Sequence, residues 1–168
     1  MQDHHNPDAR AESEAPRQGH PYAQFWLNMV LGFIVMYFAM FSMIDGRSDF
    51  RHNLNMLYMA ATMWAPMGIF MLATMPGMFP NRTVNLALYL LFLLIMAGSF
   101  AATRVQANIN DRQFIASMIP HHSGAILMCR KADLRDPELL ALCRSISEGQ
   151  RREIDQMRSI DQRLSVHR

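Results

Sequence analysis

The sequence predicts an all-α membrane protein, in which three transmembrane helices precede an antiparallel helical hairpin that dimerises into a four-helix bundle. The first observation is a set of three uncharged stretches of at least 20 residues, each long enough to cross a bilayer. The second is a charged C-terminal part whose apolar residues recur at helical spacing. The third is that only 2 of the 168 residues are cysteine, so the fold cannot rest on a disulfide scaffold.

Residues 1–21 are polar and contain prolines and charges of both signs. They lack the apolar core of a secretory signal, and their composition is typical of a disordered tail. The tail contains His4, His5 and His20. We interpret these histidines as incidental, with weak metal binding as the alternative.

The three predicted spans are Tyr22–Ile44, Leu54–Met75 and Thr83–Ala102. Short loops containing arginine and aspartate separate them, so residues 22–102 are predicted to form a transmembrane region embedded in a lipid bilayer. The basic residues near the ends of the spans are divided three against four between the two sides. The positive-inside rule therefore does not decide on which side the C-terminal part lies.

Methionine is frequent, with 16 residues, and many of these follow helical spacing within the spans. The second span carries Met56, Met59, Met63, Met67, Met71 and Met75 on one face, and the first carries Met29, Met36, Met40 and Met43. Antiparallel neighbours could set these stripes together as a sulfur-lined seam. Flexible methionines also fill gaps between packed helices, and we prefer this interpretation because no charged or imidazole group joins the stripes inside the membrane.

Residues 103–168 are predicted to form a C-terminal domain of two helices. Asn110 or Asp111 provides the N-cap of the first helix. The run Asp136-Pro137-Glu138 supplies a cap, a proline at the first helical position and an early acid for the second helix, which continues to about Ser165.

Folding these helices back on each other about Leu134 and Arg135 places Gln150 opposite the region of His121. It also brings Cys129 near Cys143, close enough to form a disulfide or share a soft metal. A helical pair of this size rarely buries enough apolar surface to stand alone. We therefore expect it to form a homodimer or to dock on the membrane helices.

The stretch from Met118 to Cys129 concentrates two imidazoles, two thioethers and a thiol within twelve residues. Met118 lies three residues before His121 and four before His122, so all three are neighbours on a helix surface. Sulfur and imidazole together favour copper, above all Cu(I), with Cu(II) as the second choice. The alternative is that one histidine packs in the core, the other is solvated, and the methionines fill gaps.

A longer set of residues resembles a known family: Asp111, Phe114, Met118–His122, Gly124–Ile126, Met128, Asp136–Glu138, Gln150, Glu153, Ile154 and Met157. The pattern is similar to the membrane-anchored subgroup of the bacterial family called domain of unknown function 305. The resemblance implies a ferritin-like helical bundle, a multi-pass position in the bacterial inner (cytoplasmic) membrane, and copper binding by the methionines and histidines of the motif. It marks as candidate ligands Met118, His121, His122, Met128 and Met157.

We therefore expect a membrane-anchored copper-binding protein that buffers copper or hands it on. Its expected protein partner is a copper donor or a copper acceptor. We expect no enzymatic activity, because the chain contains no Glu-x-x-His pair, no phosphate-binding glycine loop and no nucleophile elbow. A net charge of only +2 argues against nucleic acid as a partner. Two alternatives stay open: a helical oligomerisation module with structural histidines, and an oxidoreductase or copper transporter that uses the methionine stripes.

Overall fold

The computed structural model describes residues 20–166, and within that range the regular elements are all helical. They are α1 (Pro21–Ala39), η2 (Met40–Met43), η3 (Arg47–Asp49), α2 (Leu54–Thr74), α3 (Arg82–Val105), α4 (Asp111–Lys131) and α5 (Pro137–Val166). The predicted all-α class is confirmed. The tail predicted for residues 1–21 lies outside the described residues, except for His20 and Pro21, which begin α1.

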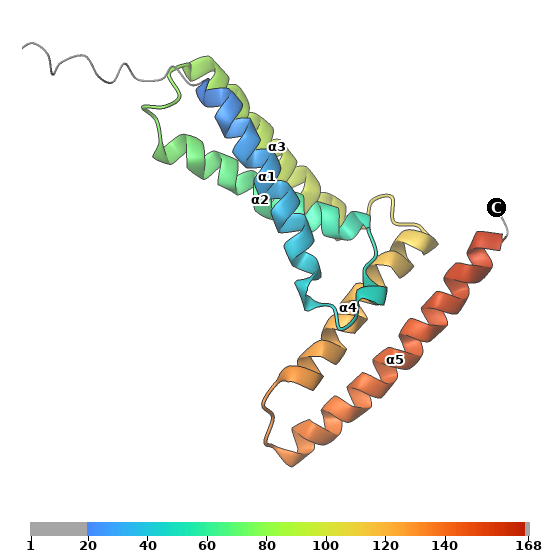
Figure 1. Cartoon of the computed structure of the whole chain (residues 1–168). Coiled ribbons are helices and arrows are strands. Elements are labelled where there is room, and N and C mark those ends of the chain that lie inside the picture. Colours follow the sequence, from blue (N-terminus) through green and yellow to red (C-terminus); the bar gives the residue numbers. More distant parts are fainter. Residues whose placement is uncertain (1–19, 167–168) are drawn as a thin grey trace, which may run out of the picture.

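Three helical segments are long and apolar enough to cross a membrane: Pro21–Met43, Leu54–Thr74 and Arg82–Val105. They match the three predicted spans, and the third continues three residues past the predicted end. The segments form one bundle, in which the start of α1 and the α2–α3 loop lie at one end (Figure 1). The loop with η3 lies at the other end, beside α4 and α5.

The bundle of α1, α2 and α3 is packed around aromatic rings. Its core contains Phe25, Met29, Ala65, Leu72, Phe79, Leu88 and Phe92. A Cβ added to Gly68 would lie 2.7 Å from the ring of Phe92, so the glycine permits the close approach of α2 and α3. Small residues at such contacts let membrane helices pack closely.

This small-residue face of α2 explains why Met59, Met63 and Met67 do not form the sulfur-lined seam. Met59, Met63 and Met67 are 44%, 47% and 43% exposed, so they lie on the outer surface of the bundle. Ala60, Ala65, Gly68 and Leu72 are the buried residues of α2. Nearly half of each of these three side chains is exposed, so filling the core of the bundle does not explain these methionines either.

Asparagine begins three of the helices. The side chains of Asn53, Asn81 and Asn110 each accept a hydrogen bond from backbone N–H groups in the first turn of α2, α3 and α4. Asp136 accepts in the same way from Leu139 at the start of α5. The predicted caps at Asn110 and Asp136 are confirmed, and each satisfies a donor that the first turn of a helix leaves unpaired.

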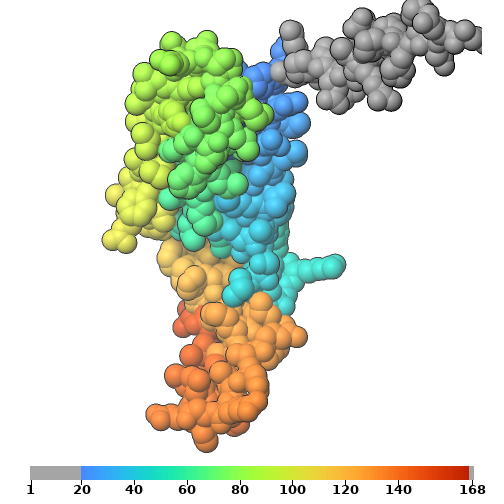
Figure 2. Space-filling model, turned by 90° about the vertical axis from the view of Figure 1, so that its left-hand side faces the viewer, coloured from blue at the N-terminus to red at the C-terminus, as the bar shows by residue number. Residues whose placement is uncertain are grey.

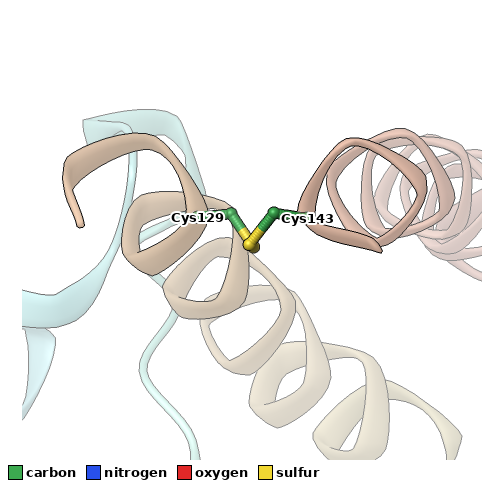
Figure 3. The surroundings of a disulfide bond; sticks show 2 residues. All are labelled: Cys129 and Cys143. Atoms are coloured by element: carbon green, nitrogen blue, oxygen red, sulfur yellow. A yellow bond between two sulfur atoms is a disulfide. The ribbon is translucent and has the colours of Figure 1, made fainter. Parts of the chain in front are cut away.

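The helices α4 and α5 lie side by side, at the end of the molecule away from the start of α1 (Figures 1 and 2). A small core of Ile115, Ile119, Ile126 and Ile154 joins them. A disulfide between Cys129 and Cys143 ties them together beside their connecting turn (Figure 3). The prediction that these two cysteines come close enough to pair is confirmed.

Candidate metal site

Four consecutive residues of α4, His121 to Gly124, point toward different neighbouring elements. Successive side chains of a helix point about 100° apart, so a run of four covers every direction around its axis. In this chain α5 lies on one side of α4, and the loop between α1 and α2 and the first turns of α2 lie on others. Each residue of the run is therefore placed by a different contact.

His122 faces α5 and is only 8% exposed. Its Nδ1 lies 2.9 Å from the carbonyl oxygen of Met118, and its Nε2 lies 2.7 Å from Oε2 of Glu153. A carbonyl and a carboxylate both accept hydrogen bonds, so each nitrogen of the ring faces an acceptor. Both nitrogens of His122 already face protein acceptors, so Nε2 could bind a metal only if it leaves Glu153.

Ser123 is fully buried and joins α4 to the loop that precedes α2. Its hydroxyl donates to Oδ2 of Asp49 at 2.6 Å and accepts from the backbone N–H of Asp45 at 2.7 Å. Arg158 of α5 forms an ion pair with the other oxygen of Asp49. This largely buried carboxylate thus links the loop between α1 and α2 to both C-terminal helices.

Gly124 and Pro120 also shape this junction. A Cβ added to Gly124 would lie 3.3 Å from the carbonyl oxygen of Met43, so glycine lets the end of the first span approach α4 closely. Pro120 lies inside α4 and has no N–H for the carbonyl of Ala116, four residues earlier. The side-chain amide of Asn53 donates to that carbonyl at 3.2 Å instead.

His121 differs from its neighbour because its ring has no hydrogen-bond partner among the described residues. The ring borders two cavities between α4 and the membrane helices. The first, of about 240 Å³, is lined by His121 together with Met40, Met43, Met56 and Met128. The second, of about 250 Å³, is lined by His121 together with Met56, Met59 and Met118.

The chemistry of these linings suits a soft, singly charged ion. Six thioethers and one imidazole border the two cavities, and among the described residues no carboxylate or arginine lines either of them. Thioether and imidazole are ligands that Cu(I) prefers, whereas hard cations require oxygen donors. Within residues 20–166, His, Cys, Asp and Glu form no cluster of three or more that could hold a metal.

The five predicted ligands fall into two groups. Met118, His121 and Met128 border the two cavities, with Met118 and Met128 on different ones. His122 is bound to Glu153, and Met157 packs against the isoleucine core between α4 and α5. Gln150, expected opposite the histidines, has a buried side-chain oxygen with no partner among the described residues, and Glu153, one turn later, reaches His122 instead.

Four methionines of the membrane spans were missed as neighbours of His121: Met40, Met43, Met56 and Met59. Their spacing identifies two stripes, but the sequence does not show that α4 docks beside the end of the first span and the start of α2. One signal was available in the sequence. Asn53 and Asn55 lie just before Met56, and their polar side chains need hydrogen-bond partners outside the bilayer.

Comparison with known proteins supports a family assignment. The family model described as "Domain of unknown function (DUF305)" matches residues 96–161, which include α4 and most of α5. "Uncharacterized protein L153" of Acanthamoeba polyphaga mimivirus is 30% identical over 137 residues, covering 80% of this chain and 88% of that protein. No solved structure matches. The chain belongs to the family of domain of unknown function 305.

Proposed function

We propose that the protein is a membrane-anchored copper-binding protein that buffers Cu(I) or hands it on to another protein. The observation that carries the proposal is His121, an imidazole with no hydrogen-bond partner within residues 20–166 that borders two cavities lined by thioethers. Copper is the ion that the protein would bind and pass on, and we propose no chemical reaction. Met118, His121 and Met128 are the motif residues placed to hold it, and Cu(II) would bind this sulfur-rich set less well.

His122 and Met157 contribute differently in this proposal. His122 would join the ligands only when its Nε2 leaves Glu153, since its other nitrogen is held by the carbonyl of Met118. Met157 lies in the core between α4 and α5, so it would need a second copy of the chain or a local rearrangement to reach the metal. The site centred on His121 is therefore primary.

The disulfide favours one orientation in the membrane. Disulfides persist in oxidising compartments and are rare in the cytosol. The Cys129–Cys143 bridge therefore supports a C-terminal pair on the outer, oxidising side of a bacterial inner membrane. That side is also where copper would be received from a soluble donor or passed to an acceptor. Accessibility of Arg163→Cys and Asn81→Cys to a membrane-impermeant thiol reagent in cells tests it, with only the former expected to react.

We also propose that two copies associate through α4 and α5 into a ferritin-like four-helix bundle. Large apolar side chains stay exposed on this pair, namely Phe114, Leu139 and Leu142. A second pair packed against them would remove these groups from water. Sedimentation of the detergent-solubilised protein tests this, and a monomer at all concentrations would contradict it.

The test of copper binding is a titration of the purified full chain in detergent, under reducing conditions, against a competing Cu(I) chelator. We expect the wild-type protein to take up copper and His121→Ala to lose most of its affinity. His52→Ala is the matched control, because His52 bonds to Tyr37 and borders neither cavity. A wild-type protein that takes up no copper would reject the proposal.

A helical interaction module with structural histidines is the second candidate. The contacts of His122 favour it, because both ring nitrogens already serve the packing of α4 on α5. In that case His121→Ala and His122→Ala would lower the melting temperature equally with and without copper. Copper-dependent stabilisation that is lost in His121→Ala would favour the first proposal.

A further inference from the structure

We propose that the membrane helices supply a ligand to this metal site, and that the ligand is Met56 of α2. The inference rests on the proposed function and extends it, because the motif residues of the family lie in α4, in α5 and in the turn between them. It makes the site a composite of the anchor and the C-terminal pair. The anchor would then take part directly in holding copper.

Met56 is singled out by its position relative to both cavities. Of the residues that the structure describes, Met56 and His121 are the two that line both of them. A thioether and an imidazole thus flank the boundary between the cavities, with Met128 in one and Met118 in the other. Each cavity therefore offers Cu(I) one nitrogen donor and at least two sulfur donors, a set that suits its low coordination number and soft character.

The start of α2 is held firmly against α4 by the three residues that precede Met56. The backbone N–H of Leu54 donates to Oε1 of Gln113 at 2.9 Å. The side-chain amide of Asn53 donates to the carbonyl of Ala116, and that of Asn55 lies 3.3 Å from the hydroxyl of Ser117. These bonds fix Met56 beside α4 before any metal binds, which lowers the entropy cost of assembling the ligands.

Gap filling between packed helices explains Met56 and Met59 less well than metal binding does. Methionine is an adaptable filler of gaps, but Met56 borders open cavities on both sides and Met59 is 44% exposed. The position of Met56 in the chain also determines where the metal would be held. Met56 lies in the first turn of the second span, so the metal would be held at the boundary between the membrane and the C-terminal helices.

The experiment compares Met56→Leu with Met71→Leu in the full chain in detergent. Leucine keeps the side-chain volume and removes the sulfur, and Met71 is a matched control because it is half-buried on the same stripe and lines neither cavity. Competition with a Cu(I) chelator measures affinity, and Ag(I) repeats the titration with a redox-inert probe. We expect at least a tenfold loss for Met56→Leu and no change for Met71→Leu.

The ligand count provides a second readout that folding defects do not imitate. X-ray absorption on the copper-loaded protein should show fewer sulfur neighbours per copper in Met56→Leu than in wild type. Equal affinity and equal sulfur count in the two proteins would overturn the composite site. If His121→Ala still abolished binding in that case, the proposed copper function would survive; a wild type without copper binding would reject both.

Discussion

Asn53 donates its side-chain amide to the carbonyl of Ala116, the backbone acceptor that Pro120 leaves without its helical partner. The same side chain accepts from the N–H of Met56 and donates to the carbonyl of Arg51. Asn53 is only 4% exposed. One buried amide thus caps α2, closes the preceding loop and anchors α4 to the start of α2.

Replacing Asn53 by Ala should therefore destabilise the protein by about 2 kcal/mol, because it removes a cap and leaves a buried carbonyl unsatisfied. Thermal unfolding in detergent, followed by circular dichroism, measures this loss. Asn81→Ala is the control, since Asn81 also caps a helix but is exposed, and it should cost about half as much. Equal losses in the two variants would show that the contact with Ala116 contributes nothing.

The disulfide gives a second prediction. Cys129 and Cys143 are 14 residues apart in sequence, and closing a loop of that length stabilises a fold by about 3 kcal/mol through the entropy of the unfolded chain. The paired change Cys129→Ser and Cys143→Ser should lower the melting temperature. Copper affinity should stay unchanged, because neither cysteine lines the two cavities. A parallel loss of copper would indicate that the thiols take part in binding.

The pattern of residues in the sequence was sufficient to predict the five α-helices of residues 20–166 and the proximity of the two cysteines. Uncharged runs identify the spans, and Asn110 and Asp136 mark helix starts, because length and capping are local properties. The contact of α4 with α2 is not local, since it depends on how Asn53 and Ser123 find partners more than sixty residues away. The sequence therefore does not show which methionines surround His121.

The register between α4 and α5 shows the same limit on a smaller scale. Folding the chain about its turn places Gln150 opposite the histidines, whereas Glu153 forms the hydrogen bond to His122. The difference is one helical turn. Glu153 lies at the edge of the apolar stripe of its helix, so periodicity alone gives it no priority.

Met118 and Met128 border different cavities, which gives a third prediction. Met118 lies one turn before His121 and shares the second cavity with Met56, whereas Met128 lies about two turns beyond His121. Met118→Leu should weaken Cu(I) binding at least tenfold, about 1.4 kcal/mol, and leave the fold intact. Met128→Leu should lower affinity or stoichiometry less. Chelator competition that gives equal affinities for wild type and Met118→Leu would reject a ligand role for Met118.

The last prediction separates the two adjacent histidines. His122→Gln should lower the free energy of unfolding by about 1–2 kcal/mol, because a buried ring that bonds to Glu153 and to the carbonyl of Met118 is lost. It should change copper affinity little. His121→Gln should do the reverse, since its exposed ring has no hydrogen-bond partner within residues 20–166 and borders both cavities.

Melting temperature and chelator competition, measured on both variants in the same detergent, give the comparison. If His122→Gln lost copper as strongly as His121→Gln, then Nε2 of His122 would have to leave Glu153 when the metal binds. The pair with Glu153 would then be a property of the metal-free state. Glu153→Ala, which removes the competing carboxylate, should in that case strengthen copper binding, whereas it should leave affinity unchanged if His122 serves only the packing of α4 on α5.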